Sequence, residues 1–156
     1  MKQSVRMEQI QHEMRPGVIT RDGFLGSDRR SLSEILDKDD AEVKRLGYSH
    51  ASIAARMREL REAGRRGLGL TIGVAPHFDV RVDSVRGRLP CPFGHAGVFP
   101  KTNITVTNRR TGRTVIYTDL SIHMIERHGF YEGEGSPFRI APRDLAETIE
   151  PLPASD

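Results

Sequence analysis

Cysteine is nearly absent from the chain. Cys91 is the one cysteine among 156 residues, which excludes an internal disulfide framework and is typical of a reducing compartment. No stretch approaches the ~18 apolar residues that a membrane helix needs, and the first residues contain no apolar signal core. We therefore expect a cytoplasmic protein without a membrane partner.

An excess of charge of one sign is also lacking. The chain has 24 basic and 21 acidic residues, a net charge of +3 that is too small to indicate a dedicated nucleic-acid binder. Residues 81–113 hold seven basic residues and one acid, a net charge of +6, whereas residues 114–156 hold three basic residues and eight acids, a net charge of −5. The basic middle can meet an anionic partner or pair with the acidic end of the same chain, and we favour the second.

What is present resembles an ordinary globular composition, with 37% hydrophobic and 29% charged residues. Residues 3–14 have loosely helical apolar spacing and are stopped by Pro16-Gly17. Further on, the patterns predict three helices, which begin at Ser31-x-x-Glu34, at Asp39-x-x-Glu42 and at Ser49.

After Gly69 the apolar period changes from helical to alternating. Strands are predicted over 77–83, around Ile104 and Val106, and over 114–118, with a hairpin loop at 108–112. A helix then runs from Thr118 or Asp119 to Gly129, with Phe130 closing over Ile125, and Pro142 opens a last short helix. The predicted fold class is α+β, with an N-terminal three-helix layer followed by a small, mostly antiparallel sheet and a helix after the hairpin.

We expect one compact unit built from four segments. They are an N-terminal arm (1–20), a helical segment (21–68), an α+β segment (69–150) and a disordered tail (151–156). The arm is the predicted contact of a homo-oligomer.

The strongest chemical signal lies in two short segments. Cys91-x3-His95 and His123-x4-His128 supply one thiol and three imidazoles, which form a plausible tetrahedral zinc set. The first pair resembles half of a zinc knuckle (Cys-Pro-x-x-Cys-Gly), with Phe93 and His95 in place of the second cysteine pattern.

Two versions of the site remain open. His123 and His128 lie ~140° apart on an ideal helix, so both reach one ion only if the helix has ended by His128. A site of Cys91, His95 and His123 is easier to build, and its open fourth position suits a zinc-dependent enzyme with Glu126 as a base. The metal-free alternatives are structural roles for these side chains, or a Cys91 nucleophile activated by a histidine.

A second hypothesis concerns nucleic acid. The segment LGYSHASIAARMREL resembles a helix-turn-helix, with its turn at Gly47. In that interpretation the protein binds nucleic acid through five residues, namely His50, Ser52, Arg56, Arg109 and Arg110. If neither hypothesis holds, a metal-free interaction or assembly module remains.

A weak anion site is the last candidate. Arg139 and Arg143 follow a glycine-rich loop that lacks the Gly-Lys-Ser/Thr of a nucleotide-binding P-loop. The two arginines can bind a substrate carboxylate or pair with Glu132 and Glu134, and we expect the pairing.

Overall fold

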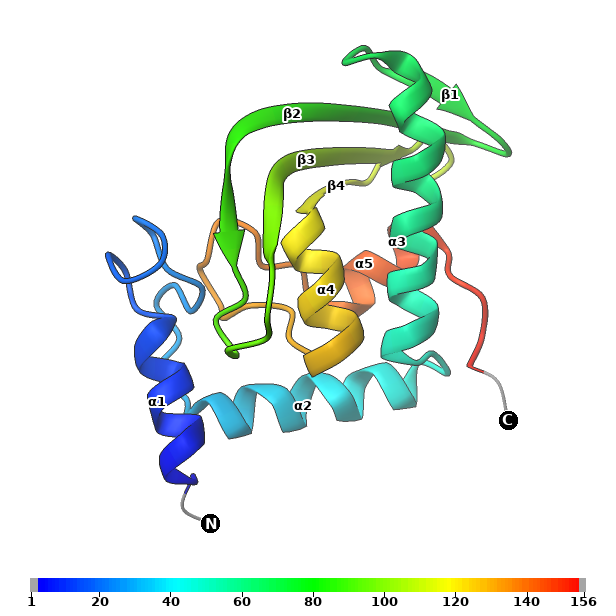
Figure 1. Ribbon diagram of the computed structural model, residues 1–156. Coiled ribbons are helices and arrows are strands. Elements are labelled where there is room, and N and C mark those ends of the chain that lie inside the picture. Colours follow the sequence, from blue (N-terminus) through cyan, green and yellow to red (C-terminus); the bar gives the residue numbers. More distant parts are fainter. Residues whose placement is uncertain (1–2, 155–156) are drawn as a thin grey trace.

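A computed structural model describes residues 3–154. The helices are α1 (Val5–Glu13), α2 (Leu32–Arg45), α3 (His50–Gly64), α4 (Asp119–His128) and α5 (Pro142–Ile149), and the 3-10 turn η1 (Arg65–Gly67) follows α3. The strands are β1 (Ile72–Val74), β2 (Phe78–Pro90), β3 (Val98–Asn108) and β4 (Thr114–Thr118). Three helices precede the sheet and α4 follows its last hairpin directly, which confirms the predicted α+β class (Figure 1).

Helix ends follow the capping chemistry of the sequence. The Ser49 and Thr118 hydroxyls accept from backbone N–H groups in the first turns of α3 and α4, and both form reciprocal capping boxes. Gly129 ends α4 in the left-handed conformation at φ 61°, and the next N–H, of Phe130, bonds the Met124 carbonyl at 3.1 Å. The ring of Phe130 joins the buried cluster that contains Met124, not the one that contains Ile125.

The prediction of separate helices after Ser31 and Asp39 is wrong. One helix, α2, runs through both segments. Asp39 does not cap a helix, because its carboxylate is buried and accepts two hydrogen bonds from Arg139, at 2.5 and 3.0 Å. A residue type that usually starts a helix is therefore used here as the partner of a buried arginine.

The sheet is an antiparallel meander in the order β1-β2-β3-β4. Strands β2 and β3 are much longer than the sequence patterns predict, and Figure 1 shows both bending sharply along their length. The register shifts between Val85 and Arg88, at a bulge that contains Gly87 (φ 111°). The bend carries the β2–β3 loop toward α4.

The main core fills the space between the sheet and helices α3, α4 and α5. Its side chains include Phe78 and Val80 of β2, and the fully buried Tyr117 of β4. The Tyr117 hydroxyl donates to the Met57 carbonyl at 2.8 Å, so the one polar atom of this ring is satisfied inside the core.

A second buried cluster ties the N-terminal helices to the far end of the β2–β3 hairpin. It contains Met14, which directly follows α1, Ile35 of α2 and Met124 of α4, together with Cys91 and Phe93 of the hairpin loop. This cluster holds the loop against the C-terminal half of α4.

The two chain ends complete the description. In the predicted arm, α1 packs within its own chain through Ile10 and Met14. In the predicted tail, Pro151 is buried and the Ala154 N–H bonds the Gly47 carbonyl at 2.9 Å. Residues 1–2 and 155–156, which belong to these two segments, lie outside the described residues. No helix within 3–154 is long and apolar enough to cross a membrane.

Candidate metal centre

The first half of the centre is the loop that closes the β2–β3 hairpin. Pro90 pairs with Val98 at the end of the ladder, so residues 91–97 form the connection. The Gly94 N–H bonds the Cys91 carbonyl at 3.0 Å, and Gly94 has a positive φ of 82° that glycine adopts without strain. This tight turn places Cys91, which is buried, and His95, which is exposed, on the side of the loop that meets α4.

The second half is the C-terminal half of α4. The helix ends at Gly129 as predicted, and His128 is its last helical residue, so the earlier end that would let both histidines reach one ion does not occur. The rings of His123 and His128 nevertheless lie with their centroids 5.5 Å apart. Aromatic contacts hold both rings, because Phe93 stacks on His128 at 4.1 Å and Phe99 lies 4.4 Å from His123.

The two halves bring Cys91, His123 and His128 together, and they place His95 beside His123. Cys91 Sγ lies 3.6 Å from His128 Nε2, and His95 Nδ1 lies 3.3 Å from His123 Nε2. Ligand atoms of Cys91, His123 and His128 all lie within 4.8 Å of one another. The His95 ring centroid is 5.1 Å from those of both other histidines. The chain therefore has a cluster of one thiol and at least two imidazoles that could hold a metal ion.

The surroundings keep the imidazoles of His123 and His128 neutral. Burial first, and then the nearby His123 and His95 because cationic rings would repel one another, lower the pKa of His128 to about 4. Burial also lowers the pKa of His123. Burial raises the pKa of the Cys91 thiol. At neutral pH the lone pairs of His123 and His128 are thus available to a metal, whereas the Cys91 thiol needs the charge of a cation before it gives up its proton.

Glu126 does not lie free beside this cluster. Its Oε2 is 3.1 Å from Arg58 Nη2, in an ion pair that joins α4 to α3. Both residues line an open groove of about 580 Å³ that His95 and His123 also border. The base proposed from the sequence is therefore held by an arginine.

The residues assigned to nucleic-acid contact on α3 point into the protein instead. The His50 ring bonds the Tyr131 hydroxyl at 2.8 Å and the Asp40 carboxylate at 2.9 Å, and Ser52 belongs to the capping box. Arg56 donates to the Ile149 carbonyl at 2.8 Å, and its guanidinium lies 5.0 Å above the Phe78 ring. The first turn of α3 thus faces its own chain.

The loop arginines and the proposed anion pair are also engaged. Arg109 bonds Asp79 at 2.8 Å and Arg110 lies 3.4 Å from Glu150. Arg139 does not pair with Glu132 or Glu134 as we expected, because it holds Asp39 on α2. Arg143 lies 3.6 Å from Glu42. These four arginines already have carboxylate partners, so they do not form an open anion site.

Sequence reasoning missed the side chains that orient the ligands. Phe93 lies in the hairpin loop and Phe99 follows it, and nothing in their spacing indicates that they contact His128 and His123, which lie 35 and 24 positions further along the chain. The available signal is residue type, because both residues are aromatic and lie in or next to the loop that carries the predicted ligands.

Comparisons with protein-family models, with curated proteins and with solved structures found no significant match for this chain.

Proposed function

We propose that this protein binds zinc in a tetrahedral centre formed by Cys91, His95, His123 and His128. Two distances support the proposal. At Zn–S and Zn–N bond lengths of about 2.3 and 2.05 Å, tetrahedral geometry separates sulfur from nitrogen by about 3.6 Å and two nitrogens by about 3.3 Å. The Cys91–His128 and His95–His123 pairs lie 3.6 and 3.3 Å apart. These match two opposite edges of the tetrahedron.

The chemistry of the donors selects zinc. A thiolate with neutral imidazoles is the mixed soft and borderline set that Zn²⁺ takes, while Mg²⁺ and Ca²⁺ need oxygen ligands. Hydrogen bonding without a metal explains less well why these four side chains lie together. Among the side chains of residues 3–154, the thiol and the three rings form hydrogen bonds only with one another, and none of the three rings forms an ion pair with a carboxylate.

The centre is structural in this proposal. Four protein ligands leave no position for a reacting water, and Glu126 is paired with Arg58. The metal joins the tip of the β2–β3 hairpin to the end of α4. It thereby supports the second core cluster, to which Cys91 contributes its side chain. A catalytic centre is the less favoured version. In it Cys91, His123 and His128 hold the metal, and the position of His95 is open to water.

Elemental analysis of the full chain tests the site. We expect about one zinc per chain in the wild type, and loss of that zinc in both Cys91→Ser and His123→Ala. His50→Ala is the matched control, because His50 is a half-buried histidine that contacts Tyr131 and Asp40 instead. Retention of full zinc by either ligand variant, or a wild type that takes up none when zinc is supplied, would refute the proposal.

X-ray absorption at the zinc edge then separates the two versions. One sulfur and three nitrogen neighbours support the closed centre. One sulfur and two nitrogens with an added oxygen, unchanged by His95→Ala, would support an open one instead.

A further inference from the structure

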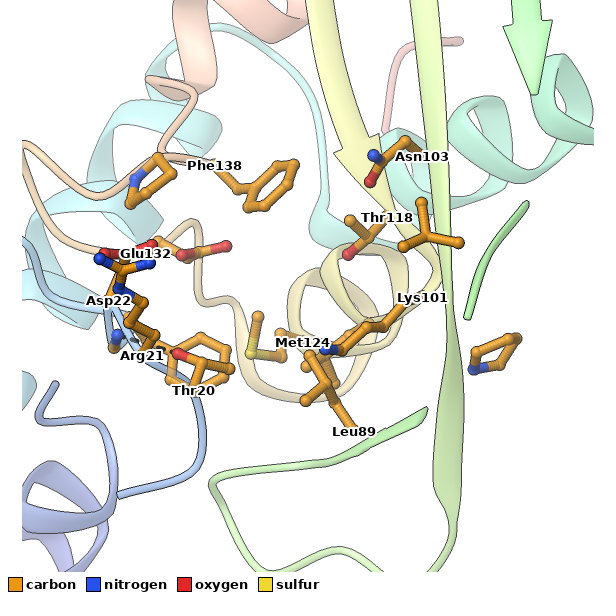
Figure 2. A pocket seen from close by; sticks show the side chains of 16 residues that line it. Thr20, Arg21, Asp22, Leu89, Lys101, Asn103, Thr118, Met124, Glu132 and Phe138 are labelled. Atoms are coloured by element: carbon orange, nitrogen blue, oxygen red, sulfur yellow. Dashed lines mark hydrogen bonds between the residues drawn. The ribbon is translucent and has the colours of Figure 1, made fainter. Parts of the chain in front are cut away.

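A second pocket lies beside the bent part of the β2–β3 hairpin. It has a volume of about 310 Å³, near the lower end of small-molecule sites. Its walls are the loop at 20–24, the bent parts of β2 and β3, the first half of α4 and the loop at 132–138 (Figure 2). None of the four metal-ligand candidates lines it.

One wall carries a buried carboxyl group. Glu132 is 5% exposed, and Figure 2 shows its carboxylate directed into the pocket. Its Oε1 accepts a hydrogen bond of 2.6 Å from the Ser136 hydroxyl, while Oε2 has no partner within residues 3–154. Burial raises the pKa of Glu132 to about 7, against the opposing effects of Ser136 and Arg139. Arg139 lies nearby but donates to the Glu132 carbonyl oxygen, and the carboxylate itself forms no ion pair within residues 3–154. An ammonium group in the pocket would supply that direct partner.

Close backbone contacts between the loop that contains Gly133 and the loop that contains Phe24 hold Glu132 in this position. The Gly133 N–H bonds the Phe24 carbonyl at 2.8 Å, and a Cβ at Gly133 would come within 2.3 Å of the Leu25 carbonyl oxygen. Glu132 itself has a left-handed φ of 68°, which is costly for a residue other than glycine. Strain of this kind persists where the surroundings over-determine it, and it clusters at binding sites.

The facing wall carries a positive charge. Lys101 extends from β3 into the pocket from the side opposite Glu132 (Figure 2). It forms no ion pair within the described part of the chain, although arginines throughout the molecule do. Between Glu132 and Lys101 the lining includes the apolar side chains of Leu89, Met124 and Phe138. The oppositely charged Arg21 and Asp22 also line the pocket, at the end where Glu132 lies (Figure 2).

We infer that this pocket binds a small zwitterion whose ammonium group meets Glu132, whose anionic group meets Lys101, and whose short apolar body lies along Leu89, Met124 and Phe138. Charge-assisted hydrogen bonds at both ends fix the direction of the ligand, and the apolar lining supplies the buried area. This inference is independent of the proposed zinc centre.

Calorimetric titration of the full chain, as purified and with zinc present, tests the inference. The probes are ω-aminobutanoate, ω-aminohexanoate and ω-aminooctanoate, with hexylamine and hexanoate as analogues that keep one charged end. We expect one zwitterion to bind at least about tenfold more tightly than either single-charge analogue. Glu132→Gln should remove its advantage over hexanoate, and Lys101→Met its advantage over hexylamine.

Two matched variants control for fold and for general charge. Glu134→Gln changes an exposed carboxylate of the same loop, and Lys44→Met changes an exposed lysine on α2, so both should bind as the wild type does. The inference is overturned if no zwitterion exceeds both analogues, or if Glu132→Gln binds it with unchanged affinity. Binding that persists after zinc is removed separates this site from the metal centre.

Discussion

The ring of His128 lies flat on the ring of Phe93, with centroids 4.1 Å apart and planes inclined by only 7°. Phe130 contacts Phe93 edge-on, with ring centroids 5.6 Å apart. The stack joins the hairpin loop to the end of α4 and limits rotation of the His128 ring. It therefore holds His128 Nε2 beside Cys91 Sγ before any metal binds.

Replacing Phe93 with alanine should weaken zinc binding without removing a ligand. Loss of an orienting contact around a metal site commonly lowers affinity about 10- to 100-fold, and we expect a loss in this range. Competition with a chromophoric chelator measures it. Phe138→Ala, which removes a ring from the small-molecule pocket, should leave zinc affinity unchanged. Equal affinities for Phe93→Ala and wild type would show that the stack does not position His128.

Removing zinc should destabilise the protein most strongly at the hairpin tip. At free zinc 100-fold above its dissociation constant, binding adds about 2.7 kcal/mol to the free energy of unfolding. Hydrogen exchange should therefore accelerate over 89–99 and 124–130 when a chelator is added, while Val80 and Val106 in the main core stay protected. Cys91→Ser should show no response to zinc or chelator. A uniform acceleration of hydrogen exchange over the whole chain would show that zinc does not stabilise the hairpin tip locally.

The sequence predicted the types of ligand but not their convergence. Cys91, His95, His123 and His128 stand out because of their residue types and short spacings. Their convergence depends on the long, bent β2–β3 hairpin, and the sequence does not show the residue pattern expected of its strands. Beyond Val82 most of β2 is exposed, so the alternation of buried and exposed residues that indicates a strand disappears. β1 has only three residues and left no readable period.

Buried charge is the other feature that the sequence could not reveal. Asp39 and Arg139 lie 100 positions apart, and each has an ordinary local interpretation, as a helix cap and as a loop cation. Glu132 likewise resembles one of two loop glutamates. Only tertiary packing distinguishes it from Glu134, whose side chain is 66% exposed. Capping boxes and glycine ends could be predicted because their chemistry is local.

Breaking the buried pair on α2 should be costly. Asp39 and Arg139 have side chains 5% and 14% exposed, so Asp39→Ala leaves a guanidinium with no counter-charge in a poorly solvated place. We expect a loss of about 3–5 kcal/mol in the free energy of unfolding, measured by urea denaturation. The double variant Asp39→Leu with Arg139→Met should recover much of this loss, because it buries no unpaired charge. Additive losses in the double variant would mean that the two side chains do not stabilise each other.

Stability should fall as pH rises from about 5 to about 7 because of Glu132. Burial raises the pKa of this carboxyl from 4.5 to about 7, so in that range the folded chain keeps a proton that the unfolded chain has released. The full difference corresponds to about 3 kcal/mol and is reached above pH 7. Glu132→Gln, which keeps an oxygen for the Ser136 hydroxyl, should remove this slope and be the more stable protein at pH 8.

The lowered pKa values of His123 and His128 also make stability depend on pH, so the informative quantity is the difference between wild type and Glu132→Gln at each pH. Glu134→Gln should retain the wild-type slope, because its side chain is exposed to water. Parallel stability curves for wild type and Glu132→Gln would show that Glu132 is already ionised and solvated at pH 5. The carboxylate would then have no need of an ammonium group, which would also remove the electrostatic reason for a zwitterion in the pocket.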